Sequence, residues 1–216
     1  QFISGLGRRG HALFLDCRSL EYELVPLPPT DRYKIVIANT MVKRGLVDSA
    51  YNERRNQCEE GVEILRRYLP KVKALRDVSL TEFAKYKDKL PAVVAKRCEH
   101  VIAENQRVLD SVKALEAGDI PKFGLLMRAS HESLRDLYEV SCRELDIMVE
   151  AAWDVSGTCG ARMTGAGFGG CTVNLVEAEA VDGFVAKVGK TYTDKTGIKP
   201  ELYVCEAEDG AKRLKL

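Results

Sequence analysis

The chain has 216 residues, 45% of them hydrophobic and 30% charged, which is enough for one large or two small domains with a buried core. Lysine and arginine number 33 against 32 aspartate and glutamate, so the net charge of +1 gives no electrostatic basis for binding nucleic acid or an anionic membrane. We expect neither partner, and the sequence has no apolar run long enough to cross a membrane.

The cysteines and histidines do not have the spacing of a metal site. Of the seven cysteines, the two that lie closest in sequence are Cys159 and Cys171, so there is no C-x-x-C pair for zinc or for thiol redox chemistry. His11 and His100 have no carboxylate or thiol partner at metal-ligand spacing. We predict no metal site, and we expect free thiols in a reducing compartment, the cytoplasm.

The first forty residues have the composition of β-strands. Short β-prone runs occur at HALFLDC (11–17), YELVPL (22–27) and YKIVIANT (33–40). Pro28 and Pro29 lie between the second and third runs, and proline cannot serve a central strand. This part of the chain is therefore predicted to contain three short strands with a loop before the third.

The middle of the chain has the periodicity of helices. Apolar side chains recur every three or four residues from about 48 to 69 and again from 92 to 117, where Gly118 is a plausible end. The apolar face of the first of these helices carries Tyr51, Cys58, Val62, Leu65 and Leu69.

Helix starts are indicated by side chains that cap free backbone N–H groups. Ser79 followed by Glu82 predicts a capping box, and Ser141 followed by Glu144 predicts a second one. Asp119 is the predicted cap of a further helix between them.

The last part of the chain changes period. Cys171, Val173 and Leu175 alternate with Thr172 and Asn174, which predicts a half-buried strand. An amphipathic helix from 181 to 192 and a strand at ELYVCEA follow it. The pattern as a whole predicts an α+β fold, with an antiparallel sheet and helices on one side.

Four glycines fall within six residues of the stretch ARMTGAGFGGCTVNLV (161–176): Gly165, Gly167, Gly169 and Gly170. Their spacing nearly fits G-x-G-x-x-G, but that dinucleotide motif opens a helix, whereas these glycines precede a strand. A turn with positive φ and no ligand is a second explanation. Because a hairpin turn needs fewer glycines, the pattern also indicates a backbone that another group approaches closely.

The segment ARMTGAGFGGCTV resembles the third conserved motif of the GHMP small-molecule kinases, in its galactokinase form. Further segments resemble this family in the family's order: LDCRSL, SAYNERRNQCEEG, VAKRCEHVIAEN, SHESLRDLYEVSCRELD and TGIKPELYVCEAEDGA. The resemblance implies a ferredoxin-like C-terminal domain. We therefore expect residues 1–45 to be strands left from the kinase's N-terminal half and the interdomain region, and residues 46–216 to form the C-terminal domain.

The activity that the resemblance implies is phosphorylation of galactose to galactose 1-phosphate by ATP with Mg²⁺. The family's sugar signature and phosphate loop have no counterpart here, and its catalytic Asp would be the residue immediately before Gln1. The resemblance thus implies the C-terminal part of a galactokinase, inactive alone and without a catalytic residue of its own. The missing N-terminal half would be its partner and would hold most of the ATP and Mg²⁺ site.

One position matches a substrate contact of the family. Tyr51 matches a tyrosine that contacts galactose, although periodicity alone favours core packing for it. The glycines 165–170 would lie against the sugar and the phosphate loop and support that loop by shape. The alternative function is a non-catalytic sugar-sensing or regulatory module derived from the kinase. In either case, a face exposed by the missing half predicts self-association.

Other polar residues are expected to have structural roles. Asp16 is predicted to be a solvated or hydrogen-bonded carboxylate at a strand end. Arg54 and Arg55 are expected to be solvated or paired with Glu59. His131 and Arg135 are expected to be polar residues of the surface or core whose hydrogen bonds are satisfied.

Overall fold

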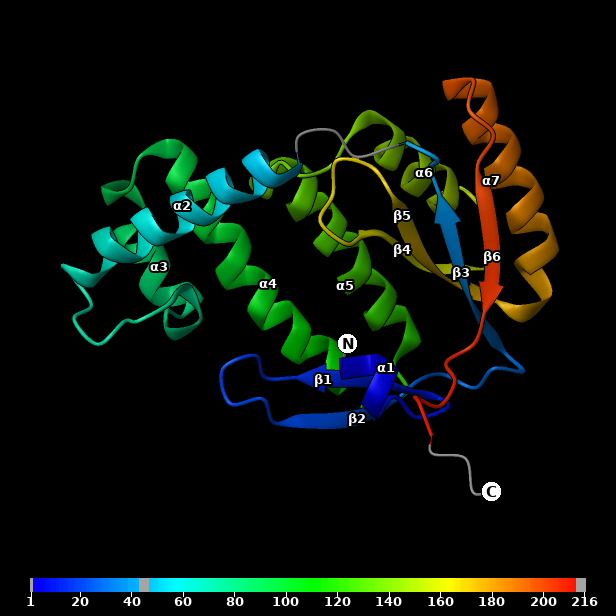
Figure 1. The fold of residues 1–216 in the computed structure, drawn as a ribbon, viewed down its shortest axis with the longest axis horizontal. Coiled ribbons are helices and arrows are strands. Elements are labelled where there is room, and N and C mark those ends of the chain that lie inside the picture. Colours follow the sequence, from blue (N-terminus) through cyan, green and yellow to red (C-terminus); the bar gives the residue numbers. More distant parts are fainter. Residues whose placement is uncertain (1, 43–46, 213–216) are drawn as a thin grey trace.

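The computed structural model describes residues 2–42 and 47–212 of the chain. It shows helices packed around two antiparallel sheets (Figure 1). In chain order the main elements are α1 (Phe2–Leu6), β1 (His11–Leu15), β2 (Tyr22–Pro26), β3 (Tyr33–Asn39), α2 (Val47–Arg66), α3 (Leu80–Tyr86), α4 (Ala92–Glu116), α5 (Ile120–Ser133), α6 (Arg143–Trp153), β4 (Thr158–Thr164), β5 (Cys171–Glu177), α7 (Val181–Thr196) and β6 (Glu201–Cys205).

The larger sheet has four antiparallel strands in the order β4-β5-β3-β6. Its strand β3 pairs with β5 on one side and with β6 on the other. Taken in chain order, β3, α6, β4, β5, α7 and β6 form the β-α-β-β-α-β arrangement of ferredoxin-like folds. The predicted α+β class with an antiparallel sheet is confirmed.

The predicted division between residues 45 and 46 lies outside the described residues. The strand β3 precedes it, yet β3 lies inside the sheet formed by β4, β5 and β6, which follow it. Within the described part of the chain, β1 and β2 pair only with each other and form a separate two-stranded sheet. The ferredoxin-like unit therefore starts at Tyr33, the first residue of β3. The sequence pattern does not reveal this start, because strand pairing depends on contacts between distant segments.

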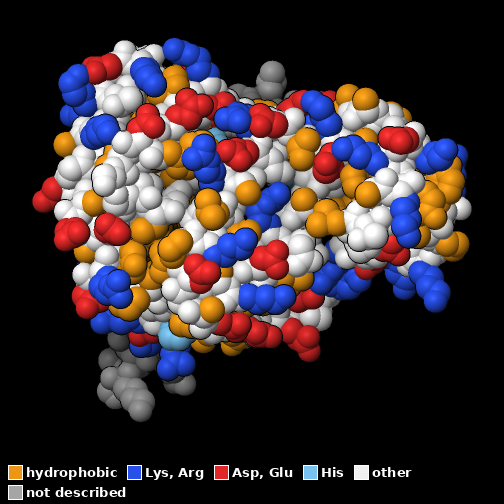
Figure 2. Space-filling view, turned by 180° about the vertical axis from the view of Figure 1, so that it is seen from behind, with side chains coloured by type: hydrophobic (Ala, Val, Ile, Leu, Met, Phe, Trp, Pro, Cys, Tyr) orange, Lys and Arg blue, Asp and Glu red, His pale blue; other side chains and the backbone are white. Residues whose placement is uncertain are grey.

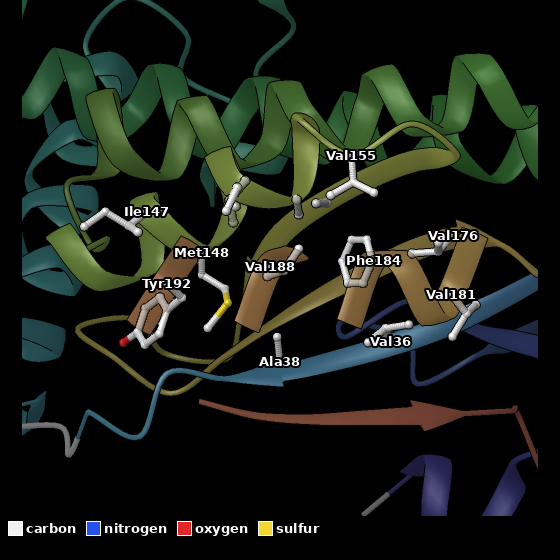
Figure 3. Close-up of a cluster of buried hydrophobic side chains, with 14 residues drawn as sticks. Val36, Ala38, Ile147, Met148, Val155, Val176, Val181, Phe184, Val188 and Tyr192 are labelled. Carbon is white, nitrogen blue, oxygen red and sulfur yellow. The ribbon is translucent and has the colours of Figure 1, made fainter. Parts of the chain in front are cut away.

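Helices α6 and α7 cover one face of the larger sheet and enclose the main hydrophobic core (Figure 3). Phe184, Val188 and Tyr192 recur one turn apart along α7 and are fully buried. They belong to one cluster with Val36 and Ala38 of β3. Full burial of a side chain such as Phe184 stabilises the fold by about 1.5–3 kcal/mol.

Helix α5 packs on the opposite face of the same sheet. Its residues Ile120 and Met127 cluster with Leu175 of β5. A β-carbon on Gly124 would lie 1.7 Å from the carbonyl oxygen of Cys159, so α5 and β4 meet backbone to backbone. The prediction of helices on one side holds for α6 and α7 and is wrong for α5, because the insertion between β3 and α6 returns a helix to the other face.

Strand β5 is buried differently from its predicted half-buried pattern. Its polar residues Thr172 and Asn174 are 0% and 1% exposed, since α6 and α7 cover their face. Asn174 Nδ2 donates to the carbonyl oxygen of Val36 at 2.8 Å, which satisfies part of its polar surface. The apolar Cys171 and Val173 point to the other face and are only half-buried. The more covered face of β5 is thus its polar one.

Helices α2, α3 and α4 form an arm with a core of its own (Figure 1). Leu65 of α2, Phe83 of α3 and Cys98 of α4 are buried in it. A β-carbon on Gly61 would lie 2.1 Å from Cys98 Sγ, so α2 and α4 are in close contact there. The arm lies beside the sheet and brings the start of α2 near the connection between β4 and β5 (Figure 1).

Two predicted helix caps are confirmed and one is wrong. The capping box of Ser79 is present at the start of α3, and Asp119 accepts the N–H of Lys122 at the start of α5. Helix α6 instead begins after Cys142, which makes no side-chain cap. Ser141 Oγ donates to Asp146 Oδ1 at 2.5 Å, so its hydroxyl is used one turn into the helix. The short helix α1 lies where no helix was predicted.

On the face shown in Figure 2, Lys and Arg side chains are interspersed with Asp and Glu side chains. None of the helices in residues 2–42 and 47–212 has both the length and the apolar character needed to span a membrane.

Candidate functional site

The glycine loop, residues 165–170, connects β4 to β5 and has an unusual backbone. Gly165, Gly167, Gly169 and Gly170 all have positive φ, at 83°, 85°, 126° and 88°. Phe168 between them also has φ of 57°, which an L-residue adopts at a cost of about 1–2 kcal/mol. The left-handed path explains why the sequence concentrates glycine here.

Two of these glycines are also required by packing against the chain itself. A β-carbon on Gly167 would lie 2.1 Å from the carbonyl oxygen of Val140, and one on Gly169 would lie 2.8 Å from that of Val42. The N–H of Phe168 donates to the Val140 carbonyl at 2.8 Å. Close backbone approach was predicted for this loop, and at these two positions the approaching group belongs to the same chain. Gly165 and its neighbour Ala166 are exposed at the tip.

The base of the glycine loop is fixed by β3 and α7. The N–H and the Oγ1 hydroxyl of Thr40 both donate to the carbonyl oxygen of Gly170, at 2.9 and 2.7 Å. The carbonyl of Thr40 accepts in turn from the hydroxyl of Tyr192 at 2.8 Å. Since Thr40 and Tyr192 are fully buried, these hydrogen bonds hold one end of the loop against the core.

The other side of the loop rests on a support segment, residues 137–140, which ends a π-helical turn (Leu134–Tyr138). Glu139 in this segment has φ of 55° and is followed by Val140, the residue that touches the loop. Arg54 of α2 donates to the carbonyls of Tyr138 and Glu139 at 2.7 and 3.0 Å. Arg97 of α4 donates to the Leu137 carbonyl at 2.6 Å.

We call these hydrogen bonds of Arg54 and Arg97 to the support segment the clamp. Charge pairing strengthens it. Arg97 Nη2 lies 2.7 Å from Glu139 Oε2, and its side chain is 3% exposed. Hydrogen bonds from Arg97 and Lys96 lower the pKa of Glu139 to about 2. Two helices distant in sequence therefore hold the support segment, and through Val140 they hold the glycine loop.

A buried histidine joins α5 to the strand that enters the loop. His131 is 0% exposed, and its Nδ1 accepts the N–H of Met163 at 3.3 Å. Its Nε2 lies 3.4 Å from Asp146 Oδ1, the oxygen that Ser141 also contacts. Because Nδ1 accepts a hydrogen bond, a neutral His131 carries its proton on Nε2.

Tyr51 lies near the start of α2 and is 60% exposed. Periodicity placed it on the apolar face of this helix, but its side chain is mostly in solvent, unlike Val62 and Leu65 further along. One turn on, Arg54 is 9% exposed and reaches the support segment. The pKa of Tyr138 is raised to about 12, first by burial and then by its interactions with Cys58 and Tyr51.

The remaining polar residues divide between confirmed and corrected predictions. Arg55 pairs with Glu59 at 2.8 Å, as predicted, whereas the prediction of a solvated or Glu59-paired Arg54 is wrong. Asp16 is a hydrogen-bonded carboxylate, held by two contacts from Arg76 at 2.8 and 2.6 Å. These contacts and the N–H groups of residues 18 and 19 keep the pKa of Asp16 well below its usual range.

Arg135 is a satisfied polar residue, as expected, whereas His131 is satisfied only in part, because its buried Nε2 makes no hydrogen bond within the described part of the chain. His131 is buried, and Arg135 pairs with Asp136 at 2.7 Å. Among residues 2–42 and 47–212, no three His, Cys, Asp or Glu side chains are grouped so that they could hold a metal ion.

Sequence reasoning missed the two arginines of the clamp, although a signal was present. Arg54 lies three residues after Tyr51 and four before Cys58, on the predicted apolar face. Arg97 lies between Val94 and Val101 with the same spacing. An arginine on an apolar helix face indicates a buried guanidinium that needs carbonyl or carboxylate partners.

Comparison with known proteins shows which family this part of the chain resembles. Residues 111–194, from the end of α4 through the glycine loop to α7, match the family model described as GHMP kinases C terminal. This part of the chain is therefore similar to the C-terminal domain of GHMP kinases. The glycine loop and the support segment both lie inside the matched residues of this domain.

The chain is also similar to galactokinases along its whole length. It is 49% identical to the galactokinase of Fusobacterium nucleatum over 216 residues, which is 100% of this chain and 55% of that protein. It is 46% identical to the galactokinase of a Roseiflexus species over 214 residues, 99% of this chain and 54% of that protein. The chain thus spans about 55% of the length of the relatives it matches.

A solved structure has the same fold as this chain. The structure of Lactococcus lactis galactokinase complexed with galactose matches 99% of this chain and 55% of its own length, with a TM-score of 0.93 and 40% sequence identity.

Proposed function

We propose that this chain is the C-terminal part of a galactokinase, a protein that uses ATP to phosphorylate galactose to galactose 1-phosphate. The observation that carries the proposal is full-length similarity, at 49% identity, to a galactokinase of which the chain spans 55%. The ferredoxin-like unit and the glycine loop that joins its strands β4 and β5 agree with this assignment. All seven cysteines carry free thiols, which suits a reducing compartment such as the cytoplasm.

The chain's own contribution would be shape and one sugar contact. Tyr51, exposed near the start of α2, would present its hydroxyl and ring edge to galactose. Gly165 and Ala166 at the exposed tip of the glycine loop have almost no side-chain bulk and would leave room for a ligand. The buried Gly167 and Gly169, with Gly170 fixed by Thr40, would keep that tip in place. Such positioning is a large part of phosphoryl transfer catalysis.

ATP and Mg²⁺ would be held mainly by the part of the parent that has no counterpart in this chain. The described residues group no three acidic, histidine or cysteine side chains for a metal. Mg²⁺ would neutralise charge on the transferred phosphate, and the catalytic carboxylate would also come from elsewhere in the parent. We therefore expect this chain alone to be inactive.

The test is an ADP-release assay with ATP, Mg²⁺ and galactose. One sample is the chain alone, and the other is a single-chain fusion to the segment of the Fusobacterium galactokinase that has no counterpart here. We expect no release from the chain and release from the fusion. Galactose binding by the fusion without ADP release would instead favour the sugar-sensing alternative, and release by the chain alone would contradict the proposal.

The role of Tyr51 is tested in the same fusion. Tyr51→Phe removes one hydroxyl and should raise KM for galactose about 3- to 10-fold, the value of one lost hydrogen bond. The matched control is Tyr68→Phe, since Tyr68 is another exposed tyrosine but stacks on Tyr86. Equal KM values for the two variants would remove Tyr51 from the site.

A further inference from the structure

A large cavity lies between the two sheets of the molecule. It has a volume of about 370 Å³ and is walled by β1 and β2, by α4 and α5, and by the face of the larger sheet opposite α6 and α7. Most of its wall is apolar, including Leu13, Val25, Val108, Phe123 and Val173. In Figure 1, β1 and β2 lie across the ends of α4 and α5.

The cavity coincides with the incompletely covered face of the sheet. Val173 of β5 and Ile35 of β3 point into it and are half-buried. On the covered face, Thr172 and Asn174 are almost wholly buried. Apolar side chains that stay partly exposed while polar neighbours on the same strand are buried indicate that a further layer belongs on this face.

The wall formed by β1 and β2 is also incomplete. These strands pair only with each other within the described part of the chain, and every residue of β1 is half-buried. A two-stranded sheet without neighbours is marginal in water, and its free edges offer unpaired N–H and C=O groups. A polypeptide segment therefore completes this wall better than a small molecule does.

One wall of the cavity carries an excess of positive charge. Arg107 and Arg162 both contact the carboxylate of Glu104, with Arg162 Nη1 3.4 Å from Glu104 Oε1. Ser130 Oγ donates to the same oxygen at 2.5 Å. The other acidic residue of the lining, Glu206, is paired with Lys34. Two guanidinium groups therefore share one carboxylate, and a second carboxylate would complete the set.

We propose that this cavity is the docking site for a segment of the parent protein outside this chain, an apolar segment that presents one carboxylate to Arg107 and Arg162. The proposal rests on the proposed function, since it takes the chain to be part of a longer kinase. The relatives have 45% of their length outside the match, which is ample chain to supply such a segment. The contact between the two parts of the parent would then include this cavity.

The test compares two neighbouring residues of α4. Val108 and Leu109 are 41% and 39% exposed, but Val108 lines the cavity, whereas Leu109 does not belong to its lining. Each variant of the full chain, Val108→Glu or Leu109→Glu, is co-expressed with the affinity-tagged segment of the Fusobacterium galactokinase that has no counterpart here. We expect Val108→Glu to reduce the co-purified chain at least 10-fold and Leu109→Glu to leave it unchanged.

A second pair tests the charge. Arg162→Met should weaken the same complex about 10-fold, whereas Arg67→Met, a change at an exposed arginine just past α2, should leave it unchanged. Circular dichroism of each variant alone verifies that it is folded. Equal effects within either pair, or no complex with the unchanged chain, would overturn the proposal.

A different occupant of the cavity would give a different result in these experiments. If a second copy of the chain fills the cavity, sedimentation of the chain alone shows a dimer that Val108→Glu dissociates, and the tagged segment captures nothing. ADP release by the single-chain fusion is measured separately, so the docking surface can fail while the proposed function stands, and the reverse also holds.

Discussion

The carbonyl oxygen of Val140 lies 2.1 Å from the position that a β-carbon on Gly167 would occupy. Real atoms do not approach so closely, so the loop between β4 and β5 and the support segment before α6 fit together only with glycine at position 167. The same contact is reinforced by the hydrogen bond from the N–H of Phe168 to Val140. The glycine loop is therefore held by packing as well as by backbone conformation.

Because of this contact, Gly167→Ala should destabilise the chain by more than the positive φ of 85° at Gly167 alone would cause. Gly118 ends α4 with φ of 67° and has nothing within 4 Å of its β-carbon position, so Gly118→Ala measures the backbone cost alone. We expect Gly118→Ala to lower the free energy of unfolding by about 1 kcal/mol and Gly167→Ala by about 1–3 kcal/mol more. Urea denaturation of both variants measures the difference; equal losses would contradict the packing argument.

The clamp on the support segment predicts a large effect of Arg97→Met. This change leaves the Leu137 carbonyl without its donor and Glu139 without its nearest cation. Because Glu139 is 44% exposed and partly solvated, we expect a loss of about 2 kcal/mol in the free energy of unfolding, less than for a fully buried pair. Arg55→Met, which breaks an exposed pair with Glu59, is the control and should leave urea denaturation unchanged.

Burial of His100 predicts that the chain loses stability in mild acid. Burial, then the charges of Arg107, Arg162 and Arg97, lower its pKa from 6.5 to about 4. Below pH 6.5 the unfolded chain therefore binds a proton that the folded chain refuses until pH about 4, and stability falls across this window. The full effect is at most about 3 kcal/mol.

Thermal unfolding between pH 7 and pH 5 tests the role of His100. His100→Gln should flatten the pH dependence in this range, because it removes the group that titrates. His11→Gln, at the half-buried start of β1, is the matched control. If both variants keep the slope of the unchanged chain, another group is responsible for it.

Thiol reactivity should differ strongly between Cys17 and Cys98. Cys17 is exposed in the turn between β1 and β2, whereas Cys98 is fully buried and burial raises its pKa to about 12. Since the thiolate is the reactive form, we expect Cys17 to react rapidly with an aromatic disulfide at pH 8 and Cys98 to react only on unfolding. Cys17→Ser should remove the fast phase; a fast phase that persists in this variant would contradict the assignment.

Local patterns were sufficient to predict most elements of the fold and its class. The spacing of apolar residues predicted α2, α4 and α7, and Ser79 and Asp119 marked helix starts. The strand β4 and the short helix α1 were not predicted. The half-buried pattern of β5 was misassigned because the pattern does not show that α6 and α7 cover the polar face of this strand.

The candidate site was only partly predictable from sequence. The concentration of glycine at 165–170 marked the loop, since a left-handed backbone leaves a local signature. The segments that touch it, Val42, Val140 and the arginines of the clamp, lie far away in the chain. Their role depends on which segments meet, and no local pattern contains that information.

The sequence by itself determined most of the helices and strands, the glycine loop and the resemblance to GHMP kinases, because each of these depends on residues that are neighbours along the chain. The tertiary structure decided that β3 lies between β5 and β6, that Arg54 and Arg97 hold the support segment, and that a cavity opens on the apolar face of the sheet. The physical reason is that pairing and burial are set by contacts between segments distant in sequence.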